Sequence, residues 1–220
     1  MASEEGRKKI VETALQMFNS RGCRSTTMDD IASALHMSKR TLYEYFATKE
    51  ELLEACLMTI HTSIERCHRQ AYSKGDEPLL MALYMIKMNT MRNIGHQRLI
   101  EDTERYYPEL HDRYFKVHTQ AFRDMIVRTL QYADRCHYLR SDIDKDTAAT
   151  FICNMVQQRR LSEVEDKDAY VQNISKICFT YLRGMLNVET IERYEQKEAG
   201  FHLIMEQLNR IDNRNMATAK

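Results

Sequence analysis

The residues of this chain that could do chemistry stand together in one short stretch, residues 38–46. Lys39, Arg40 and Thr41 follow one another near its start and supply two cations and a hydroxyl. Such groups hydrogen-bond to phosphate oxygens and base edges, and the unpaired N–H groups at the start of a helix add to them. The sequence has no nucleophile motif, phosphate loop or close metal-ligand spacing, so we expect no enzyme and no cofactor.

The elements that must position these residues are two short helices. Thr27, with Asp30 three residues later, forms a capping box that begins one helix, and Ser38 caps the next. Leu42 and Phe46, four residues apart, form the buried face of the second helix. Two helices joined by a turn of about four residues have helix-turn-helix dimensions, and the second helix of that motif enters the major groove of DNA. The same pattern also fits a plain three-helix subdomain that never contacts DNA.

Further groups beside this turn could contact the DNA backbone. The N–H groups that begin the two helices, at Thr27 and Ser38, can bind phosphate oxygens. Tyr43, Tyr45 and Lys49 stand where they can reach phosphates alongside. These contacts would fix the position of the reading helix without specifying a sequence.

The rest of the chain favours helices. Only 6 Gly and 2 Pro occur in 220 residues, and good helix formers dominate. We predict an all-α fold with a helix-turn-helix domain over residues 1–50 and a helical bundle over residues 51–220. The first helix is expected at residues 7–20, where Ile10, Ala14 and Phe18 recur at helical spacing before Gly22. The bundle helices are expected at residues 48–71, 76–94, 97–107, 108–138, 145–161, 167–187 and 189–213.

Charge and composition exclude some partners. The chain has 32 basic and 32 acidic residues, which excludes a uniformly basic binder of nucleic acid. Residues 36–49 nevertheless hold three cations against Glu44 alone, a local net charge of +2. The six cysteines form no C-x-x-C pair and no secretory signal is present, so we expect free, mostly buried thiols. The longest apolar run, residues 79–86, is far too short to span a membrane, and we expect a cytoplasmic protein.

The stretch TTMDDIASALHMSKRTLYEYFATKEELLEA, residues 26–55, resembles the TetR family of bacterial transcriptional regulators. The pattern is a Thr pair, Ile-Ala, a turn, T-L-Y-x-x-F and K-E-E-L, and the resemblance covers about residues 7–56. It implies a homodimer with an N-terminal DNA-binding domain and a C-terminal ligand-binding and dimerisation domain. It also implies a repressor that binds a palindromic operator in double-stranded DNA and is released by an unidentified small-molecule effector. Carried over by position, the DNA contacts it implies are Thr27, Ser38, Lys39, Arg40, Thr41, Tyr43, Tyr45 and Lys49.

Three residues depart from the pattern of the family. His36 stands where most members have a Gly in the turn, at a position that usually needs a left-handed backbone, and His is among the few other residues that adopt it. Tyr45 replaces the commoner His and keeps an aromatic body with a polar tip. Arg40 replaces a usually small residue, and it either reads guanine through O6 and N7 or holds a phosphate.

Two later segments carry narrow apolar seams. The seam residues are Ala149, Ile152 and Val156 in the first segment, and Val171, Ile174, Cys178, Tyr181 and Met185 in the second. They form either ordinary core or, as the resemblance implies, an interface with a second copy of the chain, and both can hold. We expect dimerisation through these helices, because a helix-turn-helix reads two half-sites about one DNA turn apart.

The effector pocket is expected among residues 48–138, but no ligand residue is assigned. Core packing is the expected role of each candidate lining residue: Met85, Met88, Met91, Tyr106, Tyr107, Tyr114, His118 and Phe122. Glu101, Asp102 and Arg105 either orient a charged effector or lie on the surface.

Two pairs of histidines share helix faces at a spacing of seven residues. They are His61 with His68, and His111 with His118. This spacing covers about 10 Å along a helix, too far for one metal ion to bridge. We therefore expect exposed or singly hydrogen-bonded histidines and no metal site.

Three functions fit these observations. The first is a sequence-specific transcriptional regulator controlled by an effector. The second is a DNA-binding architectural protein of the same fold without an effector. The third is an interaction protein whose helix-turn-helix no longer reads DNA.

Overall fold

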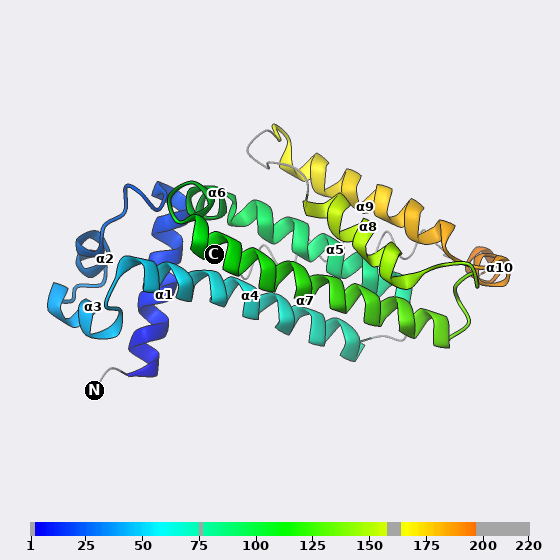
Figure 1. Ribbon diagram of the computed structural model, residues 1–220, viewed down its shortest axis with the longest axis horizontal. Coiled ribbons are helices and arrows are strands. Elements are labelled where there is room, and N and C mark those ends of the chain that lie inside the picture. Colours follow the sequence, from blue (N-terminus) through cyan, green and yellow to red (C-terminus); the bar gives the residue numbers. More distant parts are fainter. Residues whose placement is uncertain (1–2, 75–76, 158–163, 197–220) are drawn as a thin grey trace. The chain divides into compact units, whose positions relative to one another are not determined.

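A computed structural model describes the backbone of residues 3–74, 77–157 and 164–196 (Figure 1). Side chains are described for the same residues except 63–74 and 157. Several predictions fall on residues outside these ranges. They concern Asp76 as a helix start, the end of the helix at 145–161, and the last helix beyond residue 196 with Phe201, Ile204, Leu208 and Ile211.

The described residues form ten α-helices and no strand, which confirms the all-α prediction. The helices are α1 (Glu4–Arg21), α2 (Met28–Ala34), α3 (Lys39–Tyr45), α4 (Lys49–Lys74), α5 (Pro78–Gly95), α6 (Gln97–Tyr106), α7 (Pro108–Arg135), α8 (Lys145–Gln157), α9 (Lys167–Gly184) and α10 (Val188–Gln196).

Two of these helices end in the same way, at a histidine with a left-handed backbone. After α2, His36 has a φ of 53°, and the N–H group of Met37 donates to the Ala32 carbonyl at 3.0 Å. After α7, His137 has a φ of 57°, and the N–H group that follows it donates to the Ala133 carbonyl at 2.9 Å. This is the Schellman ending, in which Gly is the usual residue. The prediction of a left-handed backbone at His36 is confirmed, and α7 is shorter than the sequence predicted.

Packing divides the chain into two compact units. Unit 1 consists of Met1–Arg66 and Met91–Gln120, and unit 2 consists of Cys67–Thr90 and Ala121–Lys220. Each unit has its own apolar core. The predicted boundary between residues 50 and 51 does not coincide with the division into these units, and as a boundary between functions it stays a prediction.

The core of unit 1 fixes the three N-terminal helices against one another. Phe18 of α1, Ile31 of α2, and Leu42 and Phe46 at α3 have no exposed surface. Leu35, which the sequence also predicted to be buried, is only partly buried. Figure 1 shows α2 and α3 close together beside α1, and α1 also contacts α6. The buried face predicted for α3 is therefore confirmed.

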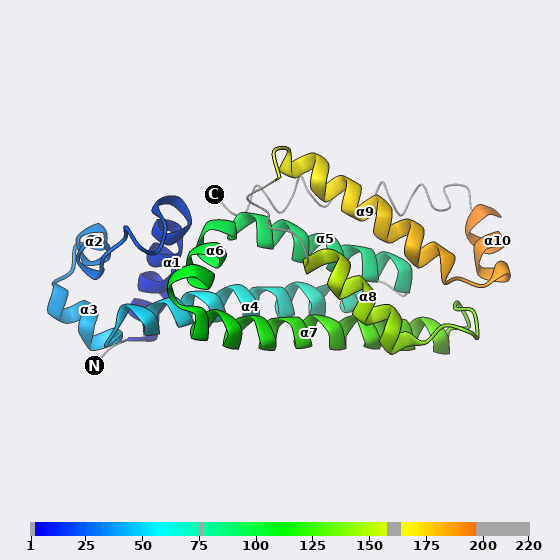
Figure 2. The ribbon, with the colours of Figure 1, turned by 45° about the horizontal axis from the view of Figure 1, so that its top comes forward.

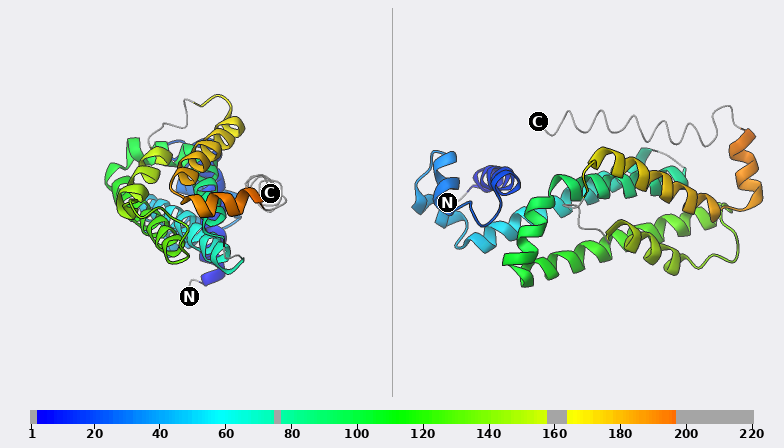
Figure 3. Two further views of the ribbon diagram at one scale, coloured as in Figure 1. Left: turned by 90° about the vertical axis from the view of Figure 1, so that its right-hand side faces the viewer. Right: turned by 90° about the horizontal axis from the view of Figure 1, so that it is seen from above.

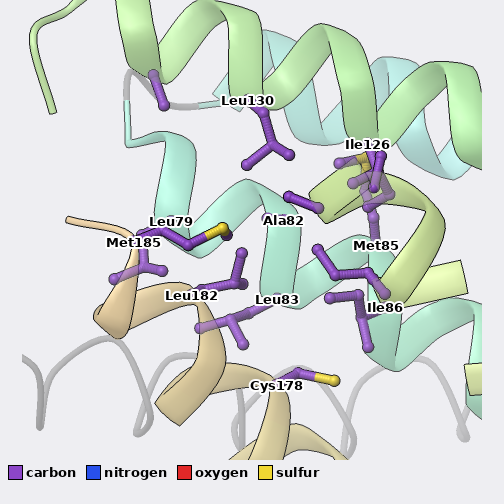
Figure 4. Close-up of a cluster of buried hydrophobic side chains, with 14 of the residues drawn as sticks. Leu79, Ala82, Leu83, Met85, Ile86, Ile126, Leu130, Cys178, Leu182 and Met185 are labelled. Atoms are coloured by element: carbon purple, nitrogen blue, oxygen red, sulfur yellow. The ribbon is translucent and has the colours of Figure 1, made fainter. Parts of the chain in front are cut away.

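Unit 2 packs around an apolar cluster contributed by α5, α7, α8 and α9 (Figure 2). Figure 4 shows side chains from three of these helices facing one another, among them Leu83, Ile126 and Leu182. α10 follows α9 at a steep angle (Figure 3). The two predicted seams lie in this core except for Val171, which is buried outside the cluster. Tyr181 is half-buried in the core and the others are buried: Ala149, Ile152, Val156, Ile174, Cys178 and Met185. The seams therefore form the core of the chain itself, and a dimer would have to use the outer faces of α8 and α9.

Candidate nucleic-acid interface

The first helix of the turn begins at the capping box that the sequence predicted. The Thr27 hydroxyl accepts a hydrogen bond from the N–H group of Asp30 at 3.1 Å, and the Asp30 carboxylate accepts one from the N–H group of Thr27 at 2.8 Å. The hydrogen bonds from Thr27 lower the pKa of Asp30 below its ordinary value. Thr27 is exposed, so the start of α2 is open to solvent.

The start of α3 is capped by Ser38, whose hydroxyl accepts a hydrogen bond from the N–H group of Thr41 at 3.0 Å. The Ser38 and Thr41 hydroxyls also lie 2.8 Å apart. Because Leu42 and Phe46 take the buried face, Lys39 and the residues around it face outward. Ser38, Lys39, Arg40 and Tyr43 are exposed, and Thr41 is half-buried.

The two cations at the start of α3 are held by exposed carboxylates. Lys39 Nζ lies 2.9 Å from Asp29 Oδ1, and this partner raises the pKa of Lys39. Arg40 Nε lies 3.3 Å from Glu44 Oε1, and 90% of the Arg40 side chain is exposed. Exposed ion pairs of this kind contribute little to stability because water screens them, so a phosphate or a base edge can replace either carboxylate at little cost.

The two tyrosines of α3 have different surroundings. Tyr43 is 42% exposed. Tyr45 is half-buried against the start of α1, where its hydroxyl accepts a hydrogen bond from the N–H group of Ser3 at 3.2 Å. The ring fills the space that a β-carbon on Gly6 would need. Tyr45 therefore ties α3 to α1, and its hydroxyl keeps one acceptor position at the edge of the exposed face.

Lys49 is turned inward. It is half-buried, and its ammonium group donates a hydrogen bond to the Cys23 carbonyl. Burial lowers the pKa of Lys49, while the nearby Cys23, Asp102 and Asp30 act in the opposite direction. A contact between Lys49 and a phosphate would require this bond to break.

A polar joint between α1 and α6 holds the loop before α2, and sequence reasoning missed it. Asp102 Oδ2 accepts a hydrogen bond from the N–H group of Cys23 at 2.6 Å, and Arg98 Nη1 donates to the Ser20 carbonyl at 2.5 Å. Gly22 has a φ of 90°, and a β-carbon there would lie 2.6 Å from Asp102 Oδ2 and 3.1 Å from Arg98 Nε. Gly22 is therefore needed both for the helix end and for the close approach of α6. The sequence predicted that Asp102 either orients a charged effector or lies on the surface, and it did not predict this contact with the backbone.

A run of cations at the start of α1 was also missed. The Arg7 guanidinium lies 4.1 Å from the centre of the Phe46 ring, and Lys8 and Lys9 are exposed. The sequence signal was the run of three consecutive basic residues, but Glu4 and Glu5 before it offset most of its charge in the local total. The contact between Tyr45 and the start of α1 brings this run to the side of α3.

The described part of the chain has the following features that concern metals, membranes and thiols. No group of three or more His, Cys, Asp or Glu side chains there is arranged to hold a metal ion. None of the described helices combines the length and the apolar character that a membrane crossing requires. The cysteines with described side chains are free thiols: Cys23, Cys56, Cys153 and Cys178 are buried and Cys136 is half-buried.

The chain is similar to known regulators. Residues 10–56 match the family model described as "Bacterial regulatory proteins, tetR family". The HTH-type transcriptional repressor KstR2 of Mycobacterium tuberculosis is 28% identical over 150 residues, which are 66% of this chain and 75% of that repressor. The solved structure of the ketosteroid transcriptional regulator KstR2 of Mycobacterium tuberculosis has a TM-score of 0.58 at 22% identity, over 84% of this chain and 97% of that chain. A solved gamma-butyrolactone receptor (ArpA-like protein) has a TM-score of 0.64 at 22% identity, over 94% of this chain and 98% of that chain.

The capped helices α2 and α3, with the buried Leu42 and Phe46 and the exposed polar start of α3, define a helix-turn-helix protein. The solved structures agree in fold. Residues 10–56 match the TetR family of bacterial regulatory proteins, and over 66% of its length the chain is similar to a transcriptional repressor.

Proposed function

We propose that this protein is a repressor that binds a palindromic operator as a homodimer and is released by a small-molecule effector. The observation that carries the proposal is the exposed polar face at the start of α3, above the fully buried Leu42 and Phe46. A helix held in this way can enter the major groove, which is about 12 Å wide, without disturbing its own core.

We assign the contacts with DNA from the exposure of the side chains at the start of α3. Arg40 is the most exposed of the cations of α3, and we assign it to guanine O6 and N7. Lys39 and Thr41 lie beside it and contact base edges or phosphate. The exposed helix starts at Thr27 and Ser38 contact phosphates, and the N–H group of Thr27 must first be released from the Asp30 carboxylate. The remaining members of the proposed set also contact phosphates: Tyr43, Tyr45 and, once released from Cys23, Lys49.

Dimerisation is proposed through the outer faces of α8 and α9. Phe151 of α8 is 51% exposed and Ile177 of α9 is 53% exposed. The rings of Phe151 and Tyr181 lie 4.8 Å apart, which joins the two helices into one apolar surface. Exposed apolar surface of this kind is typical of interfaces, and two copies related by a two-fold axis match the symmetry of a palindrome.

Release by an effector is supported by what the similar proteins are described as: a ketosteroid transcriptional regulator and a gamma-butyrolactone receptor. Unit 2 contains an apolar cavity of about 20 Å³, lined by Leu79, Leu130 and Leu182 among others. That volume accommodates about one water molecule, so an organic effector would have to select a more open conformation. It releases DNA only if it binds the two conformations unequally.

The test is selection of bound sequences from a random pool of DNA duplexes. A palindromic product is expected, and Arg40→Ala should weaken binding to it by about 1 to 3 kcal/mol and relax the preference at one position of each half-site. The matched control is Arg140→Ala, since Arg140 in unit 2 also holds an exposed carboxylate, that of Asp142, at 2.6 Å. It should leave binding unchanged.

Two outcomes would contradict the proposal. Enrichment across the pool without a palindrome would favour the architectural protein. Binding that is indifferent to Arg40→Ala and to salt concentration would favour the interaction protein, because contacts with phosphate give a steep salt dependence.

A further inference from the structure

The first turn of α1 packs against the end of α3. The Tyr45 hydroxyl accepts a hydrogen bond from the N–H group of Ser3 at 3.2 Å, and the Arg7 guanidinium lies 4.1 Å from the centre of the Phe46 ring. Phe46 has no exposed surface, whereas Arg7 is exposed. The guanidinium therefore covers the Phe46 ring on one side and is open to solvent on the other.

The contact with the ring leaves the donors of the Arg7 side chain available. A guanidinium is planar and has five N–H groups, and its attraction to the face of an aromatic ring needs none of them as a conventional hydrogen-bond donor. The Arg7 side chain donates no hydrogen bond to a described residue. Its fork matches a phosphate group, which can accept two parallel hydrogen bonds from it. Because the ring already restrains the side chain, less conformational entropy is lost when a phosphate binds.

Arg7 differs in its charge partners from the cations at the start of α3. Lys39 Nζ lies 2.9 Å from Asp29 Oδ1, and Arg40 Nε lies 3.3 Å from Glu44 Oε1. Among the residues that the structure describes, Arg7 forms no ion pair. A phosphate must therefore displace a carboxylate from Lys39 or Arg40, whereas at Arg7 it displaces no described carboxylate.

The acidic residues near Arg7 in the sequence do not neutralise it. At 100° per residue, Glu5 lies on nearly the opposite side of α1 from Arg7. Glu4 lies in the first turn of α1, where a carboxylate stabilises the positive end of the helix. Lys8, next in the run of cations, already lies 3.9 Å from the carboxylate of Glu12. Arg7 is therefore the cation of this run that contacts the end of α3 and keeps its charge available.

The length of α3 relates this cation to the groove. α3 has seven residues, Lys39–Tyr45, and is about 10 Å long at 1.5 Å per residue. The major groove is about 12 Å wide. A recognition helix of this length that touches base edges with its first residues has its other end close to the sugar-phosphate backbone at the border of the groove. Arg7 lies at that other end, over Phe46.

We propose that Arg7 binds a phosphate of the DNA backbone beside each half-site, as a contact made from outside the helix-turn-helix; this rests on the DNA binding proposed above. The ring of Phe46 holds the guanidinium in place, and its N–H groups donate to the phosphate oxygens. Because Phe46 also anchors α3 in the core, this contact fixes how α3 sits in the groove. It carries no information about the base sequence.

The test titrates the full-length protein with the selected palindromic duplex and with a scrambled duplex of the same length, by fluorescence anisotropy at several salt concentrations. Arg7→Gln should weaken binding to both duplexes by the same factor, about tenfold. It should also make the slope of log K against log salt shallower by about 0.9 for each subunit bound. Arg7→Lys keeps the charge but loses the planar fork, so it should keep the slope of the wild type and lose part of the affinity.

The matched control is Arg193→Gln, since Arg193 is an exposed arginine of unit 2 whose guanidinium lies 4.3 Å from the centre of the Tyr138 ring. It should bind both duplexes as the wild type does. A purely structural role of Arg7 would lower the midpoint of thermal unfolding and weaken binding without changing the salt slope. An unchanged slope in Arg7→Gln, or a loss confined to the palindrome, would therefore overturn the proposal.

The wild type separates this proposal from the proposed function. If the wild type binds the palindrome and Arg7→Gln binds it with the same affinity and slope, the contact at Arg7 is wrong and the regulator remains. If the wild type binds neither duplex, both proposals are wrong.

Discussion

Unit 1 and unit 2 are held together in different ways. In unit 1, hydrogen bonds join residues far apart in the chain: Cys23 with Asp102 at 2.6 Å, Asn19 with His96 at 2.8 Å, and Lys49 with the Cys23 carbonyl. In unit 2 the core is mainly apolar, although Lys87 and Asn89 are also buried in this unit. Its hydrogen bonds between distant residues, such as Asn187 with the His137 carbonyl at 2.7 Å, lie beyond the ends of α7 and α9. Ion pairs such as Arg123 with Asp146, at 2.7 Å, lie nearer the surface. A directional hydrogen bond can be exchanged for another at small net cost, whereas close-packed apolar side chains resist rearrangement. Unit 1 is therefore the part suited to switching, and unit 2 is the part suited to scaffolding.

The largest effect on the free energy of unfolding is expected in unit 2. Leu83 of α5 has no exposed surface and packs in the cluster of Figure 4. Leu83→Ala should lower the free energy of unfolding by about 3 kcal/mol, through lost burial and the cavity left behind. Urea unfolding measures this loss. Val188→Ala, at a side chain that is 71% exposed, is the control and should change stability by less than about 0.5 kcal/mol.

Features set by neighbours in sequence could be predicted. The caps at Thr27 and Ser38, the helix end at Gly22 and the buried pair Leu42 and Phe46 all follow from spacings of one to four residues. Such spacings are fixed by helix geometry, whatever the rest of the chain does. The elements that position the reading face were therefore readable from the sequence.

Features set by distant residues could not be predicted. Asp102 lies 79 residues from Cys23, and Tyr45 lies 42 residues from Ser3. Nothing in the local pattern distinguishes a carboxylate that holds a loop from one that lies in water. The seams of α8 and α9 show the same limit: their periodicity predicted an apolar face, but it could not say that the chain's own α5 and α7 cover it.

An intermediate effect is expected at the polar joint of unit 1. Gly22→Ala forces a φ of 90° on a residue with a side chain and puts a β-carbon 2.6 Å from Asp102 Oδ2, so it should cost about 2 kcal/mol. Gly184 is the matched control, because no described residue lies within 4 Å of its β-carbon position at the end of α9. Gly184→Ala should be neutral or stabilise by up to about 1 kcal/mol.

A double variant sharpens this result. If the approach of Asp102 is part of the cost, Gly22→Ala and Asp102→Ala together should cost less than the sum of the two single changes. Strict additivity in urea unfolding would mean that the backbone angle alone requires Gly22, and that α6 approaches the loop without depending on it.

The smallest effect on stability is expected from His96, and it distinguishes unit 1 from unit 2 most clearly because it depends on pH. Burial, and after it the Arg92 charge, lowers its pKa from 6.5 in the unfolded chain to about 4 in the folded one. As the pH falls below 6.5 the unfolded state binds a proton that the folded state does not, so stability present above pH 6.5 is lost between pH 6.5 and about 4. From pH 7 to pH 5 the loss from this group is about 1 to 2 kcal/mol.

His96→Gln should remove that loss, because Gln can still hydrogen-bond to Asn19 but does not titrate. Its unfolding free energy, measured in urea at pH 7 and pH 5, should fall by less than that of the wild type. An equal fall in the two unfolding free energies would mean that His96 binds a proton as readily in the folded state as in the unfolded chain. The Leu83→Ala loss should be the same at both pH values, since apolar burial binds no proton. If the stability change depends on pH for His96→Gln but not for Leu83→Ala, the titrating group lies in unit 1, which also contains α3.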